Sequence, residues 1–214
     1  MANVNVAFGL RPVGVVGSAP NSTGTTEYRI ASNNTNAIYQ GAPVIPLSTG
    51  FIDRVGAATG GTVGIVGVFW GCEYVSASTG KKVWSNYWPG SGANSTYPVK
   101  AYVYDNPLQT FVIATSNINT SWDTEAELRA GVFANADFAG AQSGSTITGL
   151  SSATLDVQTI AATNTLNMRI IGIQEDPENA DFAAAGIPVL VRLNNHFNSP
   201  NGSILAGTVS TTGV

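Results

Sequence analysis

Apolar residues along the chain come in short segments, which are separated by loops rich in Gly, Ser, Thr and Asn. The densest stretch covers residues 62–90, where segments 63–75 and 83–88 flank a turn at 78–80. The first segment shows little alternation, which is typical of a strand covered on both faces, and its glycines indicate bulges or close backbone approach. Because three of the four tryptophans lie in this hairpin, we predict that it forms the centre of the fold.

Among the other apolar segments, 26–30, 98–105 and 154–160 show the two-residue period of half-buried strands. We predict strands over residues 11–16, 26–30, 37–40, 43–47, 51–55, 98–105, 110–115, 154–160, 166–174 and 187–195. The one predicted helix covers residues 120–129, where Thr124 and Glu127 fit a capping box and Gly131 takes the place of a C-terminal cap. This pattern predicts an all-β fold, either a jelly-roll-like sandwich or a β-barrel of about ten or more short strands with one short helix.

Both ends of the chain differ from its middle. Residues 1–9 have no hydrophobic periodicity and predict an extended N-terminal arm, which we expect to dock on a neighbouring subunit or another partner. Phe8 would then be the anchor and Arg11 a charged contact at the rim. Residues 10–196 show no break in composition and are predicted to form a single β domain. Residues 197–214 are rich in Ser, Gly and Asn and predict a C-terminal tail.

Charge is sparse, since only 10% of residues are charged against a usual figure of roughly 25%. Charged residues are depleted at the centres of interfaces, and aromatic residues are enriched there. The low charge and the aromatic residues therefore predict a homo-oligomer, and we expect a trimer. The net charge of −4 and the scattered Lys and Arg argue against nucleic-acid binding. No secretory signal and no apolar run of ~20 residues is present, so we expect synthesis in a cytosol and no membrane association.

Few residues suggest catalysis. His196 is the only histidine, and no serine lies in a nucleophile-elbow context, so a structural role is favoured over a catalytic one. Cys72 is the only cysteine and lies among apolar neighbours, which favours a buried thiol over a Cys72–His196 dyad. Zinc-ligand spacing and a phosphate-binding loop are also lacking. We therefore expect no enzyme, no metal site and no cofactor.

Two further clusters leave alternatives open. The acidic residues of segment 175–181 could bind calcium, but their spacing misses the EF-hand pattern, and Asp176 before Pro177 favours a solvated turn. The aromatic set Trp84, Tyr87 and Trp88 could be a sugar-stacking platform, although packing in the core or at a subunit interface is favoured.

Six short stretches together resemble one family of proteins. They are AFGLRP at residues 7–12, GVFWGCEY at 67–74, SNYWP at 85–89, YDNP at 104–107, GIQEDPEN at 172–179 and VRLNNH at 191–196. In these stretches the chain resembles the capsid decoration (cement) proteins and related structural proteins of tailed bacteriophages. The resemblance implies a β-rich, jelly-roll-like protein on the outer surface of an icosahedral shell, often oligomeric, with no catalytic residues.

Three functions follow as hypotheses. The first is a virion cement protein, bound to the major capsid protein on the capsid surface. Its expected oligomer or capsid contacts are Phe8, Leu10, Arg11, Trp84, Tyr87 and Trp88. The second is a virion-associated glycan-binding module that uses Trp84, Tyr87 and Trp88. The third is an enzyme such as a depolymerase, which the residues support least. The position of the aromatics separates the first two, because a sugar platform must be exposed and a cement contact must be buried between subunits.

Overall fold

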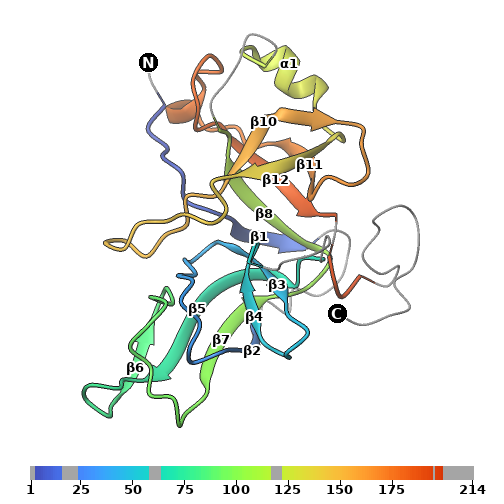
Figure 1. Cartoon of the computed structure of the whole chain (residues 1–214). Coiled ribbons are helices and arrows are strands. Elements are labelled where there is room, and N and C mark those ends of the chain that lie inside the picture. Colours follow the sequence, from blue (N-terminus) through green and yellow to red (C-terminus); the bar gives the residue numbers. More distant parts are fainter. Residues whose placement is uncertain (1–2, 16–23, 58–63, 117–121, 195, 200–214) are drawn as a thin grey trace.

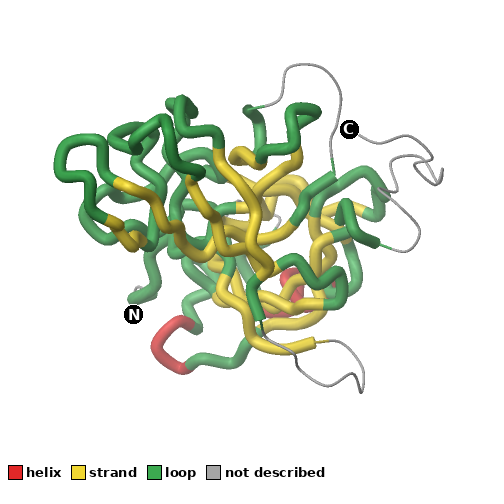
Figure 2. The backbone as a smooth tube through the Cα atoms, turned by 90° about the horizontal axis from the view of Figure 1, so that it is seen from below, coloured by secondary structure: helices red, strands yellow, loops and turns green. Residues whose placement is uncertain are grey.

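The computed structural model describes residues 3–15, 24–57, 64–116, 122–194 and 196–199. These residues form two antiparallel six-stranded sheets and one α-helix in a sandwich-like arrangement (Figure 1), which confirms the predicted all-β fold. The strands occupy the middle of the molecule and loops surround them (Figure 2). Of the predicted tail, only residues 197–199 are described, and the rest lies outside the described residues.

The first sheet, sheet A, combines strands from both ends of the chain. In order across the sheet they are β1 (Arg11–Val15), β8 (Gln109–Ala114), β12 (Pro188–Leu193), β11 (Met168–Ile173), β9 (Asn135–Ala139) and β10 (Thr154–Ala161). The edge strand β1 pairs with β8 and places Arg11 opposite Val112. Sheet A is therefore complete only when residues far apart in the sequence have met.

The second sheet, sheet B, comes from one continuous part of the chain. Its order is β2 (Thr26–Ile30), β7 (Val99–Tyr104), β5 (Gly67–Val75), β3 (Pro43–Pro46) and β4 (Ile52–Arg54), and β6 (Lys82–Ser85) also pairs with β5. Strand β5 thus pairs with three neighbours. This position agrees with the prediction that the tryptophan-rich hairpin is the centre of the fold.

Strand β5 contributes to two hydrophobic clusters. Val68 packs in a cluster with Phe111 and Leu155 of sheet A, whereas its neighbour Phe69 packs on the other side with Val103 and other residues of sheet B. Successive side chains of a strand point to opposite faces, so β5 is buried on both faces over this part of its length. The weak alternation of its sequence therefore predicted its environment correctly.

Glycines in β5 let neighbouring backbone approach closely. An ideal Cβ on Gly67 would lie 2.1 Å from the carbonyl oxygen of Tyr104. The register between β5 and β7 shifts between Phe69 and Gly71, which leaves Trp70 as the extra residue of a β-bulge. Both the close approach and the bulge were expected from the sequence.

Gly67→Ala is expected to lower the free energy of unfolding by about 2 kcal/mol, because the added methyl group meets backbone that cannot move away. Gly172→Ala in β11 is the matched control, since a Cβ there has no heavy atom within 4 Å. Urea unfolding followed by circular dichroism measures both variants. Equal stability of the two variants would show that β5 and β7 can separate at little cost.

The single α-helix of the described residues, α1, covers Glu125–Ala130. Its predicted capping box is confirmed: the Thr124 hydroxyl accepts from the Glu127 amide, and the Glu127 carboxylate accepts from the Thr124 amide. Gly131 is the C-terminal cap but has a right-handed conformation, with φ of −76°. Its lack of a side chain instead leaves room for Trp122, whose ring would lie 3.0 Å from a Cβ at this position. The predicted helix residues 120–121 lie outside the described residues.

The N-terminal arm docks on its own chain. The Asn3 side chain donates to the carbonyl oxygens of Asp181 and Ala185 at 2.9 and 2.8 Å and accepts from the Asp181 amide. The backbone amide of Asn5 donates to Asn179 Oδ1 at 2.6 Å. Phe8 is buried within the same chain. The expectation that the arm needs a neighbouring subunit for its anchor is therefore wrong, because asparagine side chains satisfy the backbone of a loop in the same molecule.

Asn3→Ala is expected to cost about 1–2 kcal/mol of unfolding free energy, since it removes the side-chain donor to the carbonyl oxygens of Ala184 and Ala185 and the acceptor of the Asp181 amide. Val4→Ala is the control, because Val4 is adjacent and exposed. Hydrogen exchange of the Asp181 amide, which donates to Asn3, gives a local readout. A variant that keeps full protection at Asp181 would show that the arm is held by other contacts.

Candidate functional site

The outer face of sheet B carries an open cluster of aromatic and charged side chains. Strand alternation brings Lys82 and Trp84 of β6 to the same face as Lys100 and Tyr102 of β7. Between these strands lies Glu73 of β5, which the register places opposite both Trp84 and Lys100. We call this surface, formed by Glu73, Lys82, Trp84, Lys100 and Tyr102, the aromatic face.

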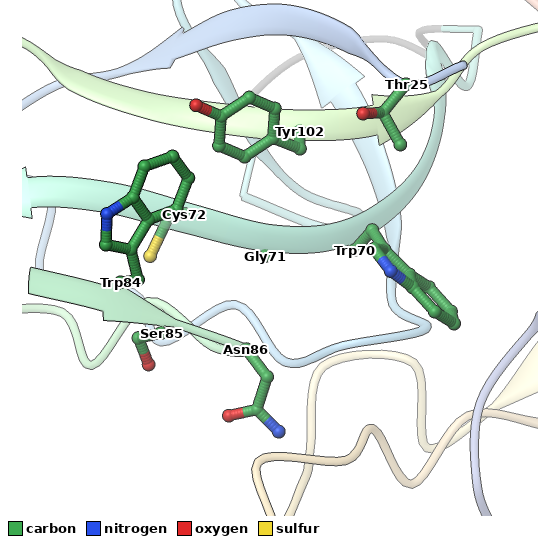
Figure 3. A pocket seen from close by; sticks show the side chains of 8 residues that line it. All are labelled: Thr25, Trp70, Gly71, Cys72, Trp84, Ser85, Asn86 and Tyr102. Atoms are coloured by element: carbon green, nitrogen blue, oxygen red, sulfur yellow. The ribbon is translucent and has the colours of Figure 1, made fainter.

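Trp84 and Tyr102 form the aromatic part of this face. Their ring centroids are 5.7 Å apart, and their ring planes differ by 13°. Figure 3 shows the two rings side by side, both with a broad face turned toward the open side. Tyr102 lies opposite Gly71 in the register, so no side chain of β5 separates it from Trp84. The Trp84 side chain remains 65% exposed, which is unusual for the largest apolar side chain.

A hollow of about 470 Å³ adjoins the two rings. Its residues are Thr25, Trp70, Gly71, Cys72, Trp84, Ser85, Asn86 and Tyr102 (Figure 3). Trp70, the bulge residue, forms the far wall and contacts Tyr104 edge to face with 5.2 Å between the centroids. Asn86 is held in place because its amide donates to the Thr148 carbonyl oxygen at 2.8 Å. The hollow is therefore a shallow, mostly apolar surface with a fixed amide at one side.

Glu73 is the electrostatic centre of the aromatic face. It is only 6% exposed, yet it forms an ion pair with Lys82 Nζ at 2.5 Å and accepts a hydrogen bond from the Tyr102 hydroxyl at 3.3 Å. The hydrogen bond from Lys82 holds the pKa of Glu73 below its usual value. Burial, followed by the nearby Glu73 charge, raises the pKa of Tyr102. At neutral pH Glu73 is thus a fixed anion, which cannot serve as a general acid.

Lys100 extends the charged part of the face to β2. Its ammonium group donates to Glu27 Oε2 at 2.9 Å, and this hydrogen bond raises the pKa of Lys100. Arg29 lies opposite Lys100 in the register and 3.8 Å from the same glutamate. These pairs are exposed, so they fix the positions of the charges more than they stabilise the fold.

The two candidate residues for covalent chemistry are both buried. Cys72 donates to the Tyr87 carbonyl oxygen, and burial raises the pKa of its thiol to about 12. Burial also lowers the pKa of His196 to about 4, and its Nδ1 accepts from the Asn198 amide at 3.1 Å. A thiol with this pKa stays protonated at neutral pH, so it is not an activated nucleophile. The predicted buried thiol is confirmed.

The acidic segment 175–181 forms a capped turn. Asp176 accepts hydrogen bonds from the Glu178 amide and from the Asn179 side chain, and it precedes the 3₁₀ helix η1 (Pro177–Asn179). Among the described residues, no group of three or more His, Cys, Asp or Glu side chains is placed to hold a metal ion. The predicted turn at Asp176 is therefore confirmed.

The structure separates the six residues expected at an interface. Phe8, Leu10 and Trp88 are buried in the chain's own core, so their assignment as interface residues is wrong. Arg11 is exposed and lies 4.3 Å from the Phe8 ring, Tyr87 is half-buried and stacks on Tyr39, and Trp84 is exposed. The hypothesis of a sugar-stacking platform made of Trp84, Tyr87 and Trp88 is also wrong. The chain bends at residues 86–87, and this bend turns the Trp88 ring into the core.

Sequence analysis missed most of the aromatic face. Tyr102, Glu73 and the lysines were not singled out, although a signal is present in the sequence. Lys82 precedes Trp84 by two positions, and Lys100 precedes Tyr102 by two positions. This spacing puts each lysine on the same strand face as its aromatic partner.

The fold and this face define an all-β, sandwich-like protein with an open aromatic surface on one sheet. Comparisons of the chain with protein-family models, curated proteins and solved structures each find no match. Within the described part of the chain, no helix combines the length and the apolar character that crossing a membrane requires.

Proposed function

We propose that this protein is a non-enzymatic structural component of a tailed-phage virion, a decoration protein that binds the outside of the icosahedral capsid and bridges capsomers. The six motif stretches that resemble this family support the proposal, and so does the all-β, sandwich-like fold. The expected partners are copies of the same chain, as a trimer, and the major capsid protein. Nucleic acid and membranes are not expected partners. The protein would be made in the host cytoplasm and reside on the capsid surface.

The observation that carries the proposal is the high exposure of several apolar side chains on loops and on the N-terminal arm. Ile147, in the loop after β9, is 95% exposed, and Phe133, just after α1, is 77% exposed. Phe133 also has a φ of +73°, a conformation that bulky residues rarely adopt. Val4 and Val6 of the arm are exposed as well. Exposed apolar groups, one of them held outward at a cost in backbone strain, are expected where a partner covers them.

Such contacts would stabilise a shell even if each one is weak. Once one copy of an oligomer holds a capsomer, the next contact is effectively intramolecular and benefits from a high effective concentration. A protein that binds only the assembled shell also stabilises that shell by mass action. The loop after β9, drawn in gold (Figure 1), is held by hydrogen bonds from Arg54 of β4 to the Gln142 carbonyl oxygen and from Asn86 to the Thr148 carbonyl oxygen, and it leaves Ile147 exposed between these two anchors.

The test uses capsids assembled without this protein. We expect the purified chain to be trimeric by light scattering and to co-sediment with the capsids until the sites are saturated. The double variant Phe133→Ser, Ile147→Ser should keep its melting temperature and lose capsid binding. Tyr97→Ser, at an exposed aromatic in the loop before β7, is the control and should bind normally. If the unchanged protein does not bind the capsids, the proposal is wrong. If light scattering shows a monomer, the expected trimer is wrong.

A further inference from the structure

The aromatic face has a composition that the decoration role does not explain. Two nearly parallel rings, those of Trp84 and Tyr102, turn their broad faces to solvent beside a hollow of about 470 Å³. The C–H groups on the flat side of a pyranose ring stack well on aromatic faces of this kind. A flat apolar platform with polar groups at its edge is therefore suited to a carbohydrate.

Charge narrows the choice of ligand. All three lysines of the chain, Lys81, Lys82 and Lys100, lie on or next to the strands that carry the two rings, although the protein as a whole has a net charge of −4. On the face that carries the two rings, strands β2, β5, β6 and β7 hold three cationic side chains and two anionic ones. The aromatic face is thus locally positive on an acidic protein, which favours an anionic ligand.

We propose that the aromatic face binds an acidic saccharide, a glycan chain that contains carboxylated sugars. One sugar ring stacks on Trp84 and Tyr102. The lysine ammonium groups face the carboxylates of that sugar or of its neighbour, and Glu73 orients Lys82 and the Tyr102 hydroxyl for hydrogen bonds to sugar hydroxyls. This site would let a virion protein hold acidic polysaccharide at a cell surface, but binding itself does not depend on a virion.

The geometry favours a saccharide over a protein partner on this face. Glu73 is 6% exposed, and its carboxylate already contacts Lys82 and accepts from the Tyr102 hydroxyl, so these polar groups are arranged before any ligand arrives. A protein contact centred on Trp84 would bury the Lys82–Glu73 and Lys100–Glu27 ion pairs with it, and removing ion pairs from water is costly even when their partners stay in place. An acidic sugar supplies both the flat apolar side and the partner charges.

The experiment titrates the isolated protein with hexamers of galacturonate, mannuronate and hyaluronan, with cellohexaose and maltohexaose as neutral references. Tryptophan fluorescence and isothermal titration calorimetry measure binding. We expect at least one acidic hexamer to bind, and its affinity to fall as salt rises. Trp84→Ala should weaken this binding about tenfold or more, and Tyr102→Ala should act in the same direction. Lys82→Gln with Lys100→Gln should reduce binding of the acidic hexamer to the level of the neutral ones.

Phe133→Ala is the matched control, because it removes an exposed aromatic side chain away from this face and should leave saccharide binding unchanged. Melting temperatures identify any variant that fails to fold. Three results would overturn the inference: no binding of any acidic hexamer at millimolar concentration, equal binding of neutral and acidic hexamers, or unchanged binding by Trp84→Ala. Loss of capsid binding in Trp84→Ala without any saccharide binding would instead identify a protein contact. None of these results decides whether the protein decorates a capsid.

Discussion

Trp88→Ala is expected to lower the free energy of unfolding by about 3–5 kcal/mol, the loss typical of removing a large aromatic side chain from a core. Trp88 has 0% exposure and packs edge to face on Tyr74, with 5.4 Å between the centroids. Its backbone also exchanges two hydrogen bonds with Ile38, at 2.8 and 3.0 Å. Truncation therefore leaves a cavity between segments that are fixed by their backbone and cannot close it.

Trp84→Ala is the matched control for this prediction. Trp84 lies only four positions earlier and has the same side chain, but it is 65% exposed, so its loss should cost less than about 1 kcal/mol. Urea unfolding followed by far-ultraviolet circular dichroism avoids a signal that depends on tryptophan. Similar losses for the two variants would contradict the assignment of one to the core and the other to the surface.

Protein stability is expected to fall as pH drops from about 6.5 toward 4, because of His196. Burial lowers the folded-state pKa of this histidine from 6.5 to about 4. In that window the unfolded chain binds a proton that the folded chain does not bind, so unfolding becomes easier as pH falls. Each pKa unit corresponds to about 1.4 kcal/mol, which gives a loss of about 3 kcal/mol by pH 4. Above pH 6.5 the contribution is constant.

The local geometry explains why protonation is unfavourable. Nδ1 of His196 already accepts a hydrogen bond from the Asn198 amide, and Nε2 is buried with no hydrogen-bond partner among the described residues. His196→Asn keeps an acceptor near the Nδ1 position and removes the titrating group. Chemical unfolding at pH 7, 6, 5 and 4.5 should show a steeper decline for the unchanged protein than for this variant. Parallel declines would mean that other groups cause the pH dependence.

Much of the fold could be predicted because its strands follow simple patterns. Residues 26–30 were predicted as a strand and form β2 with the same bounds, and the Thr124–Glu127 capping box is as expected. Strand β9 was missed because Asn135–Ala139 has little β-branched or alternating character. It is a strand because β10 and β11 pair with it on either side, a tertiary effect that local sequence does not contain. The predicted strand at 37–40 forms only isolated bridges, Ile38 with Trp88 and Gln40 with Leu150.

The candidate site was predicted less well, and the reason is one bend. If β6 continued through Trp88, the even spacing from Trp84 would place both rings on one face. The strand instead ends at Ser85, and the bend at residues 86–87 reverses the direction of the next side chains. Tyr102, which completes the aromatic face, comes from a strand on the other side of β5, so only the pairing of strands shows that it lies beside Trp84.

The different origins of the two sheets have a consequence for synthesis on the ribosome. Sheet B needs only residues 26–104, so it can form while the rest of the chain is still being translated. Strand β1 must wait unpaired until β8 emerges, and β8 gains its other neighbour only when β12 has been made. Because the N-terminal arm docks on residues 179–186, which such a chain lacks, we expect nascent chains arrested after residue 150 to show protease-resistant sheet B and a protease-sensitive arm. In the cell, the exposed edge of β8 would be the surface that chaperones must cover until translation ends.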